Sequence, residues 1–177
     1  MIRSVVPLLG FCAYGSDAGK TTLLSSLIPI LTQQHGLRIS AIKHAHHSFD
    51  IDHPGKDSYR LREAGAVQVL LGSHKRWALM TELTAITPEL TEPSLEAFVG
   101  HIDSSLADLI VVEGFRQEPI PKIEIHRPSL NVPLLANSDP HIIAVATDGP
   151  VTTHVPVLDL NNPAAISEFV LTWLASQ

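Results

Sequence analysis

Short apolar runs alternate with longer amphipathic segments along this chain. Residues 8–13 and 109–112 are nearly continuous hydrophobic runs, which are typical of parallel strands buried on both faces. Further strands are predicted at residues 39–42, 67–71, 77–80 and 142–146. Residues 123–125 alternate apolar and polar side chains, and this pattern predicts a strand at the edge of a sheet.

Between these strands, apolar residues recur at helical spacing. One helix is predicted to begin after a glycine-rich turn near residue 20, to kink at Pro29 and to end near His35 with Gly36 as a left-handed cap. A short helix capped by Asp57 or Ser58 is expected to end at Gly65. Two more helices are predicted to begin at Pro93–Ser94, with apolar positions that extend to Leu106, and at Asn162–Pro163.

Strands that alternate with helices predict an α/β fold: a doubly wound, mostly parallel sheet with helices on both faces. The chain has 177 residues, and neither an internal repeat nor a low-complexity tract interrupts it. That length suits one domain and is short for two. A single domain over residues 1–177 is therefore expected.

Composition and charge narrow the class of protein. The net charge of −6 argues against binding to nucleic acid, because such proteins usually present a basic face. Cys12 is the only cysteine, which excludes disulfides within the chain and fits a reducing compartment. Met1 to Tyr14 resembles a secretion signal, but no cleavage site follows it, and no apolar run reaches the roughly 20 residues that span a bilayer. We expect a cytoplasmic protein that is not held in a membrane.

A phosphate-binding loop follows the first predicted strand. Gly19-Lys20-Thr21 fits the second half of the motif G-x-x-x-x-G-K-S/T, and the flanking strand and helix place the P-loop of an NTPase-like fold there. Tyr14 stands where the motif has its first glycine, so Gly15 is expected to supply the turn. The predicted phosphate-binding residues are Gly15, Ser16, Asp17, Ala18, Gly19, Lys20, Thr21 and Thr22.

The chemistry expected of this loop is specific. Backbone N–H groups of residues 15–20 converge on phosphate oxygens at a helix N-terminus. Lys20 bridges the outer phosphates, and Thr21 offers its hydroxyl to Mg²⁺. Glu113, at the end of the strand at 109–112, is expected to hold the magnesium or orient a water, while Gly114 lets the backbone approach the ligand. Asp108 lies at the other end of that strand and is interpreted as its solvated start.

Base recognition is less well defined. Asp148 follows a buried strand, where guanine-specific folds place an aspartate that accepts both hydrogen bonds of the base edge. A turn at Asp148-Gly149-Pro150 explains the same residues equally well, so spacing leaves GTP and ATP open. Hydrolysis is expected to be slow, because the motifs contain no obvious arginine finger; Arg116 is the one candidate.

Histidines and aspartates are concentrated in one polar segment. A set of six falls within ten residues, and imidazole with carboxylate suits zinc or nickel: His44, His46, His47, Asp50, Asp52 and His53. Their spacing is not that of ligands on one helix, so a switch loop beside the phosphates is the favoured interpretation. Lys56-Asp57-Ser58 resembles a small anion-handling unit, although a helix cap explains it as simply.

Taken together, these segments resemble the molybdopterin-guanine dinucleotide biosynthesis adapter protein B (MobB) family. The resemblance covers the whole chain, in AYGSDAGKTTLL, IKHAHHSFDIDHPGKDSYRLREAGA, RWALMTE, DLIVVEGF and PKIEIHR. It implies a homodimeric GTP-binding protein with weak intrinsic hydrolysis, which assists the guanylyltransferase that attaches GMP to molybdopterin. It also implies that residues 15–22 hold the phosphates and that Glu113 serves the magnesium. Two alternatives stay open: an ATP-dependent enzyme of the dethiobiotin synthetase type, and a metallochaperone GTPase.

Overall fold

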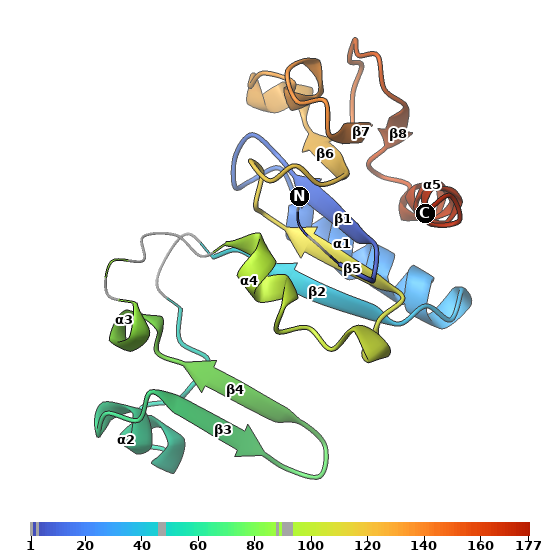
Figure 1. Ribbon diagram of the computed structural model, residues 1–177. Helices are drawn as coiled ribbons and strands as arrows, with labels where there is room; N and C mark the ends of the chain where they lie inside the picture. Colours follow the sequence, from blue (N-terminus) through green and yellow to red (C-terminus); the bar gives the residue numbers. More distant parts are fainter. Residues whose placement is uncertain (1, 3, 46–48, 88, 90–93) are drawn as a thin grey trace. The chain divides into compact units, whose positions relative to one another are not determined.

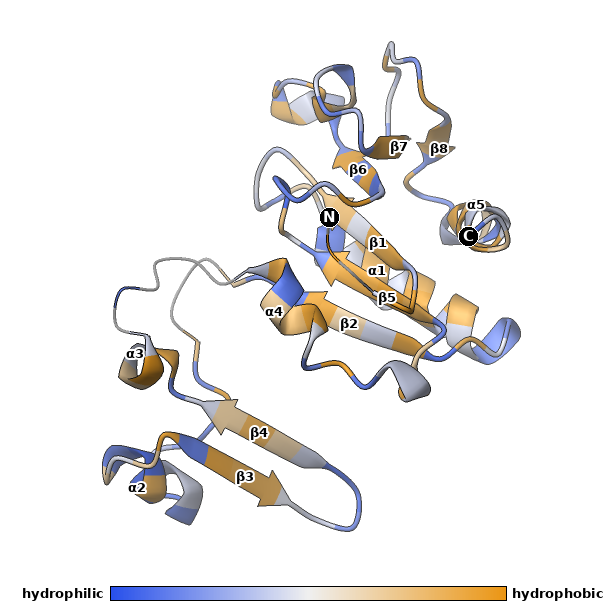
Figure 2. Ribbon diagram, in the orientation of Figure 1, coloured by the Kyte–Doolittle hydropathy of each residue, from blue (hydrophilic) through white to orange (hydrophobic). Residues whose placement is uncertain are grey.

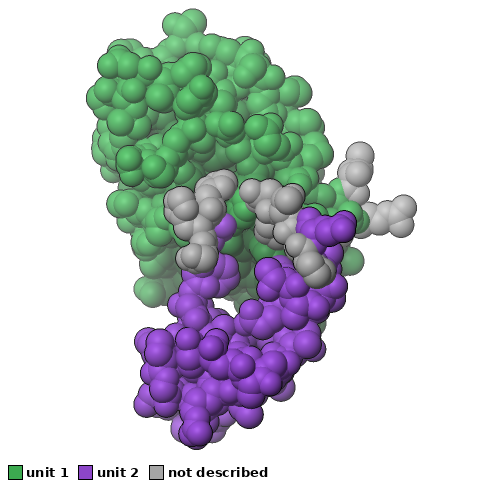
Figure 3. All heavy atoms as spheres, turned by 90° about the vertical axis from the view of Figure 1, so that its left-hand side faces the viewer, with its two compact units in different colours: residues 1–44, 94–177 green, residues 45–93 purple. Residues whose placement is uncertain are grey.

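The computed structural model describes residues 2, 4–45, 49–87, 89 and 94–177. The chain forms two compact units, which Figure 3 colours separately: Met1–His44 with Ser94–Gln177, and Ala45–Pro93. The sequence composition does not reveal either boundary, because no linker-like segment marks it. No helix in the described ranges has the length and apolar character needed to cross a membrane.

The larger unit is built on a six-stranded parallel sheet with the strand order β2-β5-β1-β6-β7-β8 (Figure 1). Every neighbouring pair in this sheet is parallel. Its strands are β1 (Leu8–Cys12), β2 (Ile39–Lys43), β5 (Leu109–Glu113), β6 (Lys122–His126), β7 (Ile142–Thr147) and β8 (Val157–Asp159). The predicted doubly wound α/β fold is confirmed.

Two strands differ from the prediction. β6 is not an edge strand: it lies between β1 and β7, and all five of its residues are buried. Its alternating pattern arises because Lys122 and Glu124 are charged residues that are buried and hydrogen-bonded rather than exposed to water. The edge strands are β2 and β8, and β8 was not predicted because its three residues are too few to show a strand pattern.

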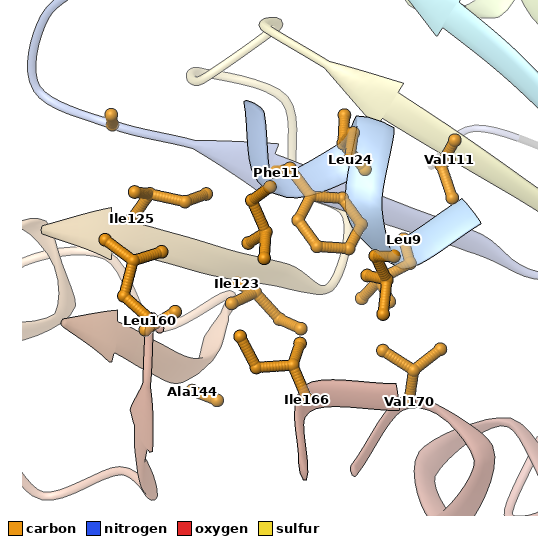
Figure 4. Packing of buried hydrophobic residues seen from close by; sticks show 14 of the residues in the cluster. Leu9, Phe11, Leu24, Val111, Ile123, Ile125, Ala144, Leu160, Ile166 and Val170 are labelled. Carbon is orange, nitrogen blue, oxygen red and sulfur yellow. The ribbon is translucent and has the colours of Figure 1, made fainter. Parts of the chain in front are cut away.

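Helices cover both faces of this sheet. On one face, α1 (Lys20–Pro29) and α5 (Pro163–Leu174) pack on the odd-numbered residues of β1. Figure 4 shows Leu9 and Phe11 of β1 within this cluster, with Ile166 and Val170 of α5 pointing toward the sheet. On the other face, α4 (Leu95–Val99) packs on Leu8 and the even-numbered residues of β5. Two apolar layers therefore fix the carboxyl ends of the strands, where α1 begins.

The helix ends follow the local chemistry of the sequence. At Pro29, which lacks a backbone donor, α1 gives way to a π-helical turn, Ile30–Gln34, and the segment ends at Gly36 with a φ of 70°. The predicted left-handed cap at Gly36 is thus confirmed, and at Pro29 the structure shows a change from α- to π-helix. Ser94 caps α4 by accepting a hydrogen bond from the Ala97 N–H, and Asn162 caps α5 in the same way. Pro93 lies outside the described residues.

The helix expected from Ser94 is shorter than predicted. It ends at Val99, and Gly100 follows as its C-cap. Leu106 belongs to a separate 3-10 turn, Ser104–Leu106, and 64% of its surface is exposed. Its helical spacing from Leu95 was therefore fortuitous.

The smaller unit contains an antiparallel hairpin and two short helices. The hairpin joins β3 (Gln68–Gly72) to β4 (Trp77–Thr81), and the helices are α2 (Asp57–Glu63) and α3 (Leu83–Ile86). The predicted cap of α2 is wrong: Lys56 is the N-cap residue, and no side chain caps this end. Ser58 instead donates a hydrogen bond to Asp52 Oδ1 over 2.9 Å. Gly65 follows α2 with a φ of 102°, as predicted.

Asp108 is not merely a solvated strand start. Its carboxylate accepts hydrogen bonds from the Arg38 side chain, at 2.6 and 3.1 Å, and from the Arg38 backbone N–H at 2.8 Å. These bonds, the side-chain ones first, lower the pKa of Asp108 to about 2 from 3.8. The contact joins the amino ends of β2 and β5.

This contact predicts a defined pH dependence. A carboxyl group whose pKa is depressed in the folded state stabilises the protein above its unfolded pKa, and that contribution is lost as the pH falls through the folded pKa. The difference in free energy of unfolding between wild type and Asp108→Asn should therefore be constant above about pH 5 and should shrink between pH 4 and pH 2. Urea titrations at each pH measure it, and a difference that stays constant down to pH 2 would contradict the assignment.

Candidate nucleotide-binding site

The phosphate loop lies between the carboxyl end of β1 and the start of α1. Gly19, the N-cap residue of α1, has a φ of 95°, and a Cβ atom there would lie 3.3 Å from an Arg127 guanidinium nitrogen. This position requires glycine. Gly15 lies in the bend before it but is not among the glycines with positive φ, and a Cβ atom there would meet nothing within 4 Å. Gly15 thus lies in the bend as expected, although the backbone there does not depend on glycine.

Lys20 folds back over the loop that it follows. Its Nζ donates a hydrogen bond to the Gly15 carbonyl over 2.8 Å, which holds the ammonium across the residues predicted to bind phosphate. Burial lowers the pKa of Lys20, and the negative charge of Glu113 opposes that shift. The ammonium is thus partly withdrawn from water. In these less polar surroundings, a phosphate ligand would interact with it more strongly than in bulk water.

Three side chains meet beside the loop, from three different elements. Thr21, in the first turn of α1, donates a hydrogen bond from Oγ1 to Glu113 Oε1 over 2.8 Å. Lys43, the last residue of β2, donates to the same Glu113 oxygen over 2.6 Å and to Thr21 Oγ1 over 3.2 Å. A hydroxyl and a carboxylate oxygen so close together are ligands that Mg²⁺ prefers. The residues predicted for the metal therefore lie together and fit it chemically.

The turn after β5 packs closely against His44. Gly114 has a φ of 95°, and a Cβ atom on it would come within 2.8 Å of His44 Cβ. The His44 backbone N–H donates to the Glu113 carbonyl over 2.9 Å, and the His44 ring stacks on Phe115 with centroids 4.6 Å apart. This packing against His44 fixes the backbone directly after Glu113, and the close approach to a ligand that we expected at Gly114 stays a prediction.

Arg127 and Asp148 brace the phosphate loop from the other side. The Arg127 Nε donates to the Ala18 carbonyl over 3.0 Å, and its guanidinium forms an ion pair with Asp148 Oδ2. The predicted base-recognition residue thus reaches the phosphate loop through an arginine. Arg116, the candidate arginine finger, donates to the Tyr14 carbonyl over 3.2 Å and lies 5.5 Å from the centre of the Tyr14 ring.

Lys43 and Arg127 are site residues that the sequence analysis missed. Both stand at the carboxyl ends of strands, where ligands of parallel sheets bind, Lys43 ending β2 and Arg127 directly following β6. A basic residue at that position was a usable signal in both cases. It was overlooked because neither residue belongs to a phosphate-loop motif.

The acidic residues of the histidine and aspartate segment have a structural role in the smaller unit. Arg62 binds Asp50, Asp52 and Glu82 at 2.8, 3.3 and 2.9 Å. His46 and His47 lie outside the described residues. Within the ranges that are described, no three His, Cys, Asp or Glu side chains gather as a metal ion would require.

Comparison with known proteins identifies the family. The family model described as molybdopterin guanine dinucleotide synthesis protein B, MobB, matches residues 8–148. The chain is 45% identical to the molybdopterin-guanine dinucleotide biosynthesis adapter protein of Escherichia coli strain K12, over 99% of this chain and 97% of the relative. It is 46% identical to the adapter protein of the same name from Haemophilus influenzae, over 98% and 92% of the two chains.

Solved structures agree on the fold. The structure of Bacillus subtilis MobB has a TM-score of 0.69 at 20% identity and covers 94% of this chain and 96% of its own. The MobB homolog from Bacillus stearothermophilus has a TM-score of 0.68 at 19% identity, with 96% and 99% covered. The predicted resemblance is thereby confirmed, and the chain belongs to the MobB family.

Proposed function

We propose that this protein is a GTP-binding adapter that assists the attachment of GMP to molybdopterin, in the biosynthesis of the molybdopterin-guanine dinucleotide cofactor. Family membership supports the pathway. The observation that supports nucleotide binding is the arrangement of three side chains at the phosphate loop: Lys20 folds over the loop onto the Gly15 carbonyl, and Thr21 is hydrogen-bonded to Glu113. In this proposal the loop binds the phosphates of GTP, Thr21 and Glu113 hold Mg²⁺, and Asp148 reads the base. As Cys12 is the only cysteine, the proposal places the protein in the cytoplasm.

An adapter role, rather than a guanylyltransferase activity, follows from the chemistry of the loop. A guanylyltransferase must leave the α-phosphate open to in-line attack by its second substrate. A P-loop wraps the β- and γ-phosphates and favours chemistry at the γ position. At most, a slow GTPase is expected, with turnover on the order of 10⁻³ per second as in GTPases that lack an arginine finger. The GMP transfer itself is left to a partner, the molybdopterin guanylyltransferase.

The test separates the adapter from the transferase. Purified protein is incubated with molybdopterin and Mg-GTP, and the guanine dinucleotide and pyrophosphate are assayed with and without the guanylyltransferase. We expect product only when the transferase is present, and more of it when this protein is added. Product formed in quantity without any transferase would overturn the adapter proposal.

A homodimer is part of the proposal, and the hairpin of the smaller unit supports it. Leu70 and Leu79 stand opposite each other on β3 and β4, and Trp77 lies on the same face. Their exposed fractions are 67%, 46% and 70%, and Figure 2 colours much of both strands as hydrophobic. Exposed apolar side chains gathered on one face are typical of an interface.

The segment from His44 to Ser58 is proposed to face the nucleotide or a protein partner.

Base preference depends on Asp148 in this proposal. Arg127 binds Asp148 Oδ2, which leaves Oδ1 and the second lone pair of Oδ2 as acceptors for guanine. Asp148→Asn is expected to erode the preference for GTP over ATP, because an amide cannot accept both guanine N–H groups. Calorimetric titration with both nucleotides measures the ratio. If the variant keeps full guanine selectivity, the base is read elsewhere.

A further inference from the structure

Lys43 stands at the position assigned to the metal. Its Nζ lies 2.6 Å from Glu113 Oε1 and 3.2 Å from Thr21 Oγ1, the two oxygens that suit Mg²⁺. The contact is built into the sheet, because Lys43 and Glu113 are register partners on the neighbouring strands β2 and β5. The ammonium thus neutralises Glu113 in the nucleotide-free protein.

An ammonium and a magnesium ion cannot use these two oxygens together. Mg²⁺ requires near-octahedral coordination with ligands at about 2.0–2.1 Å, which leaves no room for the Lys43 Nζ at its present distances. Two positive charges within a few ångströms would also repel each other. When Mg-nucleotide binds, Lys43 must therefore leave Thr21 and Glu113.

In the proposed complex, the γ-phosphate is a suitable destination for the displaced ammonium. The Lys43 side chain is 57% exposed, and its flexible stem allows Nζ to move by several ångströms. Thr21 and Glu113 would hold the metal, and in the proposed complex the γ-phosphate would supply anionic oxygens beside this pair, within reach of the displaced ammonium. A diphosphate lacks the γ-phosphate and so lacks these oxygens.

We propose that Lys43 is a specificity-determining residue that distinguishes nucleoside triphosphate from diphosphate by exchanging Glu113 for the γ-phosphate. This inference rests on the proposed nucleotide site and adds to it a residue that selects the nucleotide state. Lys20 differs in role, because its ammonium lies over the loop at Gly15 and is expected to contact the nucleotide in either state.

The experiment compares the affinities of the full-length protein for Mg-GTP and Mg-GDP by calorimetry. In Lys43→Gln, the ratio of GTP to GDP affinity should fall by about tenfold or more, the effect of one lost charge-assisted hydrogen bond. Lys43→Arg keeps the charge and should retain most of the ratio. Lys75→Gln, in the β3–β4 turn, removes the same charge from an exposed lysine and should keep the wild-type ratio.

The outcomes distinguish the two proposals. A Lys43→Gln variant with an unchanged ratio, whether both affinities fall equally or neither falls, would overturn the role of Lys43 while leaving the nucleotide site intact. Wild-type protein that binds neither nucleotide would overturn the proposed function itself. Circular dichroism and thermal melts of each variant confirm that a change in ratio does not come from unfolding.

Discussion

Lys20→Ala is expected to lower the affinity for Mg-GTP by about 10- to 100-fold, with the fold unchanged. The lost contact is one charge-assisted bond to phosphate, for which about 1.5–3 kcal/mol is typical. Lys20 begins α1 with its ammonium on the Gly15 carbonyl, and its side chain is not part of the apolar clusters on either face of the sheet. The substitution therefore removes a ligand contact and no core packing.

Calorimetry measures the affinity, and circular dichroism with a thermal melt measures the fold. Ser25→Ala is the matched control, because Ser25 is an exposed residue of the same helix and has no assigned role in the site. The control should bind like wild type. Affinity in Lys20→Ala equal to that of the control would contradict the assignment of residues 15–22 to the phosphates.

The sheet was largely predictable because most residues of its central strands β5, β1, β6 and β7 are buried. Strands such as β5 then consist of continuous apolar residues, which a sequence shows directly. β6 did not follow this rule, since two of its five residues are charged. Glu124 is fully buried and accepts two backbone N–H groups, from Leu135 and Ala136, at 2.8 Å each. A pattern of charges indicates exposure unless the partners are known, and these partners belong to a 3-10 turn 11 and 12 residues further along the chain.

The candidate site was predictable only where a local motif carried it. Lys20 and Thr21 follow from the phosphate-loop motif, and Glu113 follows from the end of a strongly apolar strand. Lys43 meets Glu113 because β2 and β5 are neighbours, although 70 residues separate them along the chain. Strand order cannot be read from spacing within a motif. Contacts of this kind therefore emerge only with the structure.

Lys122 supports the sheet from within and should be the residue whose loss destabilises it most clearly. Its side chain is 1% exposed, and its Nζ donates to the carbonyls of Arg116 and Glu118 at 2.9 and 2.7 Å and to Asp139 Oδ2 at 2.7 Å. Gly10 makes room for its stem, because a Cβ atom there would lie 2.6 Å from Lys122 Cγ. These bonds tie the loop after β5 to the strand that follows it.

Lys122→Met keeps much of the side-chain volume but removes the charge. We expect the free energy of unfolding to fall by about 3 kcal/mol, because the substitution leaves a partly buried carboxylate without its partner. For a chain of this size, that corresponds to a melting temperature lower by roughly 6–12 °C. Lys75→Met, at an exposed lysine, should change the free energy by less than about 0.5 kcal/mol.

The loss should depend on pH and on Asp139. Burial raises the pKa of Asp139, but the bonds from Lys122 and His141 outweigh it and lower the pKa overall. A carboxyl group with a depressed pKa in the folded state stabilises the protein above its unfolded pKa, and this contribution is lost below its folded pKa. The effect of Lys122→Met should therefore be largest above about pH 4 and should shrink in acid.

At neutral pH, Lys122→Met combined with Asp139→Asn should cost at least about 0.5 kcal/mol less than the sum of the two single substitutions, because the double variant holds no unpaired charge. Strictly additive losses in urea titrations would show that the two residues stabilise the fold independently, and that the ion pair is not what makes Lys122 important.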